Sequence, residues 1–104
     1  MVKIVLAVFH PELQILAEKL RPMLEEAFAM SVEVLPHQLH VPQDAFYPHR
    51  GQFLASSLIR EVAVLEGEAM LLGITEHDLF STGLSFVFGQ ASSGDHAAVF
   101  STAR

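Results

Sequence analysis

The feature that most constrains the fold is a nearly unbroken apolar stretch at residues 2–9, which a proline and a helical pattern follow closely. The stretch is rich in β-branched residues, and a run without polar alternation is typical of a strand buried on both faces of a parallel sheet. From residue 13 to residue 28, apolar side chains recur at spacings of three and four, which predicts an amphipathic helix. Pro22 lies inside this pattern and is expected to kink the helix or split it in two.

The alternation of strand and helix continues along the chain. The pattern predicts a strand at residues 32–35, a long loop at 37–50, a helix at 54–65 capped by Gly67, and a strand at 69–74. This order predicts parallel strands with right-handed crossovers and the two helices on opposite faces of the sheet. Residues 84–90 then alternate, with Leu84, Phe86 and Phe88 on one face, and a turn at 91–95 leads to a last strand at 97–101. Because so short a turn joins antiparallel strands, the expected fold is α/β: a mixed, mainly parallel five-stranded twisted sheet with an antiparallel edge strand.

The length of 104 residues predicts one small domain, residues 1–104. Five strands with about one helix on each face leave apolar sheet surface without cover. A further helix after residue 104, or a second subunit, is expected to cover that surface. The composition, 51% hydrophobic and only 17% charged, agrees with apolar surface meant for a partner, so a homo-oligomer is one expectation.

Charge and cysteine content exclude several classes of function. The net charge is −6 and the six lysines and arginines are scattered, which argues against binding to a nucleic-acid backbone. The absence of cysteine excludes disulfides and cysteine-ligated zinc or iron–sulfur sites. No signal-peptide cleavage site follows the first apolar run, and no run approaches the roughly 20 residues of a membrane span. We therefore expect a cytoplasmic protein without a membrane segment.

Four segments form an ordered set along most of the chain: YPHRGQF at residues 47–53, LGITEHDLF at 72–80, GLSFVFGQA at 83–91 and AVFSTAR at 98–104. In this order and spacing they resemble the N-terminal half of the archaemetzincins, zinc-dependent peptidases of the metzincin clan. The resemblance implies a zincin-like N-terminal subdomain, in which an antiparallel edge strand borders the substrate cleft and an extended peptide lies along it.

Carried over to this chain, the resemblance makes residues 84–90 the edge strand and Phe86, Val87, Phe88 and Gly89 the substrate-binding residues. The physical mode is β-augmentation, in which unpaired backbone N–H and C=O groups accept a peptide as an additional strand. Gly89 is expected to let the peptide backbone approach closely. The alternative is that the two phenylalanines are core residues and Gly89 is a bulge, because strand alternation needs no substrate to explain it.

The chemistry of the archaemetzincins is carried by a His-Glu-x-x-His-x-x-Gly-x-x-His motif, whose histidines ligate zinc and whose glutamate activates the bound water. This motif is absent from the 104 residues. We therefore predict no catalytic residue, no metal ligand and no cofactor within this chain, although the full-length family uses zinc. The chain is interpreted as an incomplete metzincin-like catalytic domain that is inactive by itself.

Two other groups of residues remain as alternatives. His37 and His40 are spaced like a ligand pair but lie in a predicted loop, and zinc needs three or four ligands held in place. Residues 76–78, Glu-His-Asp, follow the third strand, where ligands bind in open α/β sheets, so they either take part in acid–base chemistry or cap a turn. The rival to a peptidase subdomain is a non-catalytic interaction module that binds peptides or itself through the same edge.

Overall fold

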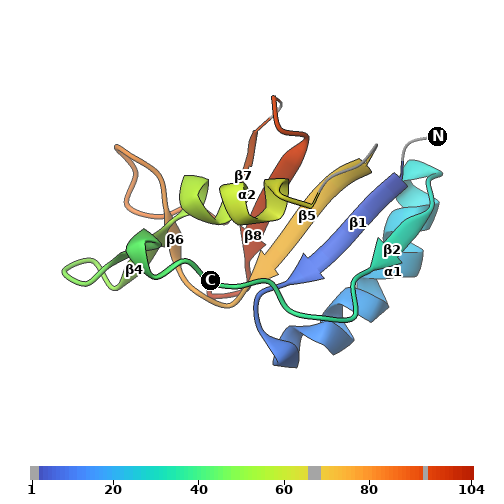
Figure 1. Ribbon diagram of the computed structural model, residues 1–104, viewed down its shortest axis with the longest axis horizontal. Coiled ribbons are helices and arrows are strands. Elements are labelled where there is room, and N and C mark those ends of the chain that lie inside the picture. The colour runs from blue at the N-terminus through green and yellow to red at the C-terminus, as the bar shows by residue number, and fades with distance from the viewer. Residues whose placement is uncertain (1–2, 66–68, 93) are drawn as a thin grey trace.

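A five-stranded mixed sheet forms the body of the molecule in the computed structural model of the chain, which describes residues 3–65, 69–92 and 94–104 (Figure 1). Its strands, in the order β2-β1-β5-β8-β7, are β2 (Val32–Val34), β1 (Lys3–Val8), β5 (Ala69–Thr75), β8 (Ala97–Ser101) and β7 (Gly89–Ser92). The first four run parallel, and β7 pairs antiparallel with β8 at the edge. The predicted α/β class with a mainly parallel five-stranded sheet is confirmed.

Two helices cover opposite faces of this sheet, as predicted. Helix α1 (Gln14–Phe28) follows the 3-10 turn η1 (Pro11–Leu13), and α2 is Ala55–Ala63. Successive side chains of a strand point to opposite faces, and in β1 they divide accordingly. Ile4 and Leu6 belong to the core cluster beneath α1, whereas Val5 belongs to the cluster beneath α2. The predicted cap of the second helix, Gly67, lies outside the described residues.

Pro22 does not split the first helix, contrary to one of the two outcomes predicted. Helix α1 continues through Pro22 to Phe28. Pro22 is exposed, so water can hydrate the carbonyl of Glu18 that the proline leaves without an N–H donor. The helix ends at Ala29, whose backbone has a left-handed conformation with φ of 52°.

A second, three-stranded sheet was not predicted and occupies part of the segment expected to be a loop. It has the order β3-β4-β6, with strands β3 (Phe46–Tyr47), β4 (Gln52–Leu54) and β6 (Leu79–Phe80), and the 3-10 turn η2 (Gln43–Ala45) precedes it. These strands are two or three residues long, too short for an alternating pattern. Their pairing joins β4 to β6, which are distant in sequence, so local residue patterns do not reveal it.

The antiparallel edge strand lies further along the chain than predicted. The expected strand was residues 84–90 and the expected turn 91–95, but β7 spans Gly89–Ser92 and the described turn residues are 94–96. Hydrogen bonds to side chains hold the start of the predicted strand in another conformation. Arg50 donates to the carbonyls of Leu84 and Ser85, and Gln52 also donates to that of Ser85.

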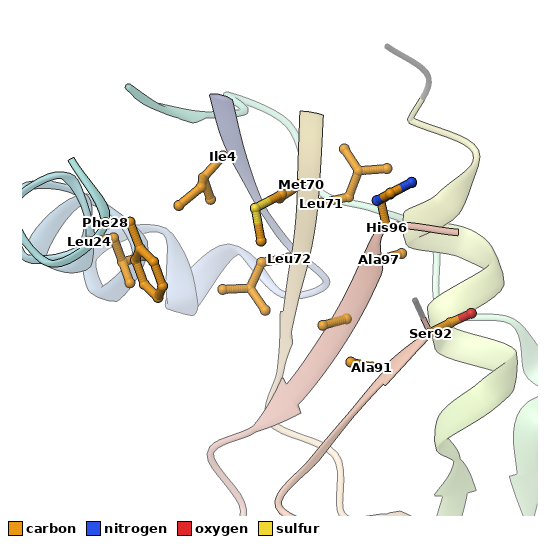
Figure 2. A pocket seen from close by; sticks show the side chains of 11 residues that line it. Ile4, Leu24, Phe28, Met70, Leu71, Leu72, Ala91, Ser92, His96 and Ala97 are labelled. Carbon is orange, nitrogen blue, oxygen red and sulfur yellow. The ribbon is translucent and has the colours of Figure 1, made fainter. Parts of the chain in front are cut away.

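The face of the large sheet beside α1 is only partly covered. Helix α1 packs against β1 and β2. Beside it lies an apolar hollow of about 390 Å³, shown in Figure 2, which reaches across β5 and β8 to β7. Phe28 and Met70 line it with 56% and 45% of their surface exposed. Within the described part of the chain, no helix combines the length and apolarity needed to cross a bilayer.

Candidate functional site

The outer edge of β7 carries backbone groups that face away from the sheet. The Ser101 N–H donates to the Phe88 carbonyl at 2.8 Å, so Phe88 faces β8. Along an antiparallel strand, the backbone N–H and C=O groups of successive residues alternate: those of one residue bond to the paired strand, and those of the next point away from it. Gln90 and Ser92, paired with Val99 and Ala97, therefore also face β8. Gly89 and Ala91 direct their N–H and C=O groups to the open side.

The same alternation explains where the open edge begins. The Val87 N–H points outward, but it donates to the Leu79 carbonyl at 2.9 Å and forms an isolated antiparallel bridge with β6. Of the predicted substrate-binding residues, Val87 thus has its N–H engaged within the chain. The outward groups after it are those of Gly89 and Ala91.

The two predicted phenylalanines lie beside the edge and contact each other. The rings of Phe86 and Phe88 meet edge to face, with centroids 5.2 Å apart. Phe86 stacks beneath the guanidinium of Arg104, 4.1 Å from the ring centroid. Phe88 is 62% exposed, so the interpretation of both rings as core residues does not hold for Phe88.

Gly89 is required by the sheet itself. A Cβ atom at this position would lie 2.8 Å from the carbonyl oxygen of Val99 and 3.1 Å from the Cβ of Phe100. Real Cβ atoms do not approach a backbone so closely, so the absence of a side chain lets β7 and β8 come together. This contact, rather than the approach of a peptide, explains the glycine; peptide binding at residues 86–89 stays a prediction.

Asp78 fixes the segment that leads to the edge. Its carboxylate accepts two hydrogen bonds from Arg104, both 2.9 Å, and one from Gln52 at 3.0 Å. These bonds, those from Arg104 above all, lower the pKa of Asp78. Arg104 thereby joins Asp78 to the Phe86 ring. Of the two roles predicted for Asp78, the contacts fit a structural one.

Histidines gather where β1 and β5 end. His10 follows β1, and its Nε2 lies 2.9 Å from the Thr75 hydroxyl at the end of β5. The His10 and His77 rings meet edge to face at 4.6 Å, and His77 stacks on Phe53 at 4.1 Å. Burial chiefly, and the neighbouring His10, lower the pKa of His77, against an opposing effect of Glu76. His77 is therefore favoured in its neutral form.

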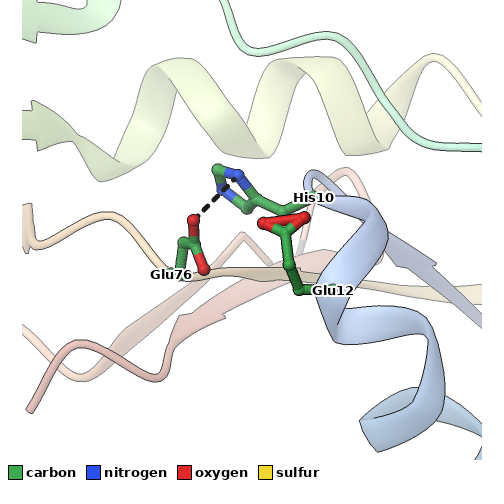
Figure 3. Close-up of side chains that lie close together, drawn as sticks. All are labelled: His10, Glu12 and Glu76. Atoms are coloured by element: carbon green, nitrogen blue, oxygen red, sulfur yellow. Dashed lines mark ion pairs between the residues drawn. The ribbon is translucent and has the colours of Figure 1, made fainter.

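Two carboxylates converge on His10 from different elements (Figure 3). Glu76 places an oxygen 3.6 Å from His10 Nδ1, and Glu12 in η1 completes a group whose ligand atoms all lie within 4.8 Å of one another. Sequence reasoning missed this group, although His10 directly follows one predicted parallel strand and Glu76 lies two residues after another. His37 and His40 are exposed and belong to no such group among the described residues.

The chain was compared with protein-family models, with curated proteins and with solved structures. No protein-family model matches the chain. The archaemetzincin of Methanopyrus kandleri is 40% identical over 74 residues, which cover 70% of this chain and 42% of that protein. The archaemetzincin of Methanocaldococcus jannaschii is 34% identical over 85 residues, covering 82% of this chain and 45% of that protein.

Solved structures agree. The crystal structure of the Methanopyrus kandleri archaemetzincin superimposes with a TM-score of 0.81 at 33% identity, over 99% of this chain and 59% of that one. That of Archaeoglobus fulgidus gives 0.75 at 25% identity, over 100% of this chain and 62% of that one. The chain is of the archaemetzincin type. It spans less than half the length of the curated archaemetzincins that it matches.

The catalytic zinc site of the archaemetzincins does not fit the residues of this archaemetzincin-type chain. The histidine-rich motif is absent from the sequence. The one group of three or more candidate ligands in the described residues supplies a single imidazole, from His10, instead of three.

Proposed function

We propose that residues 1–104 form the N-terminal, substrate-framing subdomain of an archaemetzincin-type zinc peptidase, an incomplete catalytic domain whose zinc ligands lie outside these residues. The observation that carries this proposal is the open antiparallel edge, where Gly89 and Ala91 present outward backbone groups. An extended peptide bonds to such an edge through its own backbone, which aligns the peptide whatever its sequence.

The surroundings of the edge suit a peptide in this position. A groove of about 430 Å³ lies between β7 and α2, and Arg60 and Gln90 are among its polar lining residues. The exposed ring of Phe88 directly precedes the strand. Side chains of an added strand alternate in direction, so one set of peptide side chains faces α2 and the other faces away. Residues 86–89 then contribute mainly through the Phe88 ring and the Gly89 backbone.

Peptides that differ only in backbone N–H groups test this proposal. Fluorescence anisotropy would measure the binding of capped extended hexapeptides from a pool to the chain, with no hydrolysis expected. For the tightest peptide, N-methylation at alternate residues that face β7 is expected to abolish binding, whereas N-methylation at the intervening residues leaves it intact. Equal effects of methylation at both sets would contradict strand addition.

A variant of the chain provides the matching test. Ala91→Pro removes an N–H that points away from β8, so no bond within the sheet is lost. We expect this variant to lose peptide binding and Ala91→Ser to retain it, with both variants folded by circular dichroism. Unchanged binding by Ala91→Pro would contradict the proposed edge.

A second candidate is a non-catalytic module that associates with itself. The observation that favours it is the apolar hollow beside α1, with Phe28 and Met70 exposed at its rim. A concentration-dependent dimer by light scattering, dissociated by Met70→Glu, would support self-association. If the chain is a monomer at all concentrations, we expect further residues of a longer peptidase chain to cover the hollow, as the first proposal requires.

A further inference from the structure

We propose that His10, Glu12 and Glu76 bind a divalent transition-metal ion, at a site separate from the catalytic zinc of the archaemetzincins. Their ligand atoms lie within 4.8 Å of one another. His10 and Glu12 belong to the segment that follows β1, with Glu12 in η1, whereas Glu76 directly follows β5. The site would fasten the end of β1 and the first turn before α1 to the end of β5. It is independent of the proposed peptide edge.

The group sits where an α/β sheet most readily forms a crevice. β1 and β5 are parallel neighbours, and the chain leaves them in opposite directions, through α1 to β2 and through β7 to β8. Ligands of open α/β sheets bind outside the carboxyl ends of strands at such a switch point. Glu12 and Glu76 are exposed, so an ion and its waters can reach the group from solvent.

His10 is already oriented for ligation. The Thr75 hydroxyl oxygen, which accepts a hydrogen bond from the backbone N–H of His77 at 3.1 Å, lies 2.9 Å from His10 Nε2. With the proton on Nε2 donated to Thr75, the lone pair of Nδ1 faces Glu76. Metal-bound histidines are held through their second nitrogen in this way, and that bond sets the tautomer. Thr75 is fully buried, which fixes the position of its hydroxyl.

The distances suit a small ion. Ligands about 2.0–2.1 Å from a tetrahedral zinc lie about 3.4 Å apart, and Nδ1 of His10 is 3.6 Å from Glu76 Oε1. Glu12 must approach slightly, which an exposed side chain can do. No lysine or arginine among the described residues forms an ion pair with Glu12 or Glu76. Two converging carboxylates repel each other unless a cation lies between them.

The donor set selects the class of metal. One imidazole nitrogen with two carboxylates suits Zn²⁺ or Mn²⁺, because imidazole favours transition metals. Mg²⁺ prefers oxygen ligands in octahedral geometry and retains its waters, so it is expected to bind more weakly. Three protein ligands leave at least one position for water.

Calorimetry on the tag-free chain, stripped with a chelator, tests the site with Zn²⁺, Mn²⁺ and Mg²⁺. We expect one Zn²⁺ or Mn²⁺ per chain and a higher Tm when it binds. Glu12→Gln and Glu76→Gln should each weaken binding by roughly 10-fold or more, and Thr75→Val, which frees His10 Nε2, by roughly 10–100-fold. The control is Glu26→Gln, an exposed carboxylate on α1, which should bind as the parent does.

The histidine resonances in NMR spectra separate this site from adventitious binding elsewhere. Zn²⁺ should shift the ring signals of His10 and leave those of His37 and His40 unchanged. Both glutamate variants alter exposed side chains, so their Tm in chelator should equal that of the parent. Failure to bind either transition metal, or binding that survives both glutamate substitutions, would overturn the proposal without affecting the peptide edge.

Discussion

Substitution of Gly73 tests how closely α2 packs on the large sheet. Gly73 lies in β5, and a Cβ at this position would be 2.5 Å from Val62 Cγ2 on α2 and 3.0 Å from Phe9 Cε2. Val62 is fully buried and its branched side chain has one preferred rotamer in a helix, so it cannot turn aside. Gly73→Ala therefore forces the helix away from the sheet. Overpacking of this kind costs about 1–3 kcal/mol.

Thermal and urea unfolding measure this cost directly. For a domain of this size, about 1 kcal/mol corresponds to a fall in Tm of roughly 4–8 °C. The control is Gly94→Ala, where a Cβ meets nothing within 4 Å, and its Tm should stay near that of the parent. The double variant Gly73→Ala/Val62→Ala removes the clashing methyl group. It should be more stable than the sum of the single changes predicts, by about 0.5–3 kcal/mol.

Equal Tm values for Gly73→Ala and the parent would refute this reasoning, because they would mean that α2 does not rest on Gly73. Strictly additive changes in unfolding free energy in the double variant would also refute it, because the Val62 side chain would then not be the group that the new Cβ contacts.

Two further predictions concern pH and the Asp78 contacts. Because the folded-state pKa of His77 is lowered from 6.5, the stability that its neutral form contributes should be fully present above that pH and fall as the pH drops below it. His77→Phe keeps the stacking on Phe53 and should flatten the slope of the unfolding free energy between about pH 7 and about pH 5. An unchanged slope would contradict this prediction. The bonds from Arg104 lower the pKa of Asp78, so Arg104→Gln should raise that pKa toward 3.8 and reduce the folding stability at pH values above 3.8. Titration of the carboxyl group by NMR measures the change. If the pKa of Asp78 stays low in the variant, Arg104 is not the main cause of its lowering.

The large sheet could be predicted because burial leaves a local pattern. The first strand is apolar on both faces, since β1 is covered by α1 on one side and α2 on the other. The amphipathic stripe of α1 has the same origin. These patterns arise wherever one element packs along its length against another, and they place the parallel strands and helices correctly.

The small sheet and the bounds of the edge strand could not be predicted, because side chains distant in sequence determine them. Arg50 and Gln52 bind the carbonyls of Leu84 and Ser85, which removes these residues from the expected strand. The close contact of Gly89 with Val99 sets where β7 begins to follow β8. The group of His10, Glu12 and Glu76 was overlooked for the same reason, since only the pairing of β1 with β5 brings its members together.

Amide hydrogen exchange of β7, measured by NMR with and without a bound extended peptide, tests the open edge most directly. In the free chain, we expect slow exchange at Gln90 and Ser92, which bond to β8, and fast exchange at Gly89 and Ala91. A bound peptide should slow Gly89 and Ala91 alone. Protection of all four amides in the free monomer would contradict an open edge at β7 that accepts an extended peptide. A peptide that binds without slowing amide exchange at Gly89 and Ala91 would contradict it too.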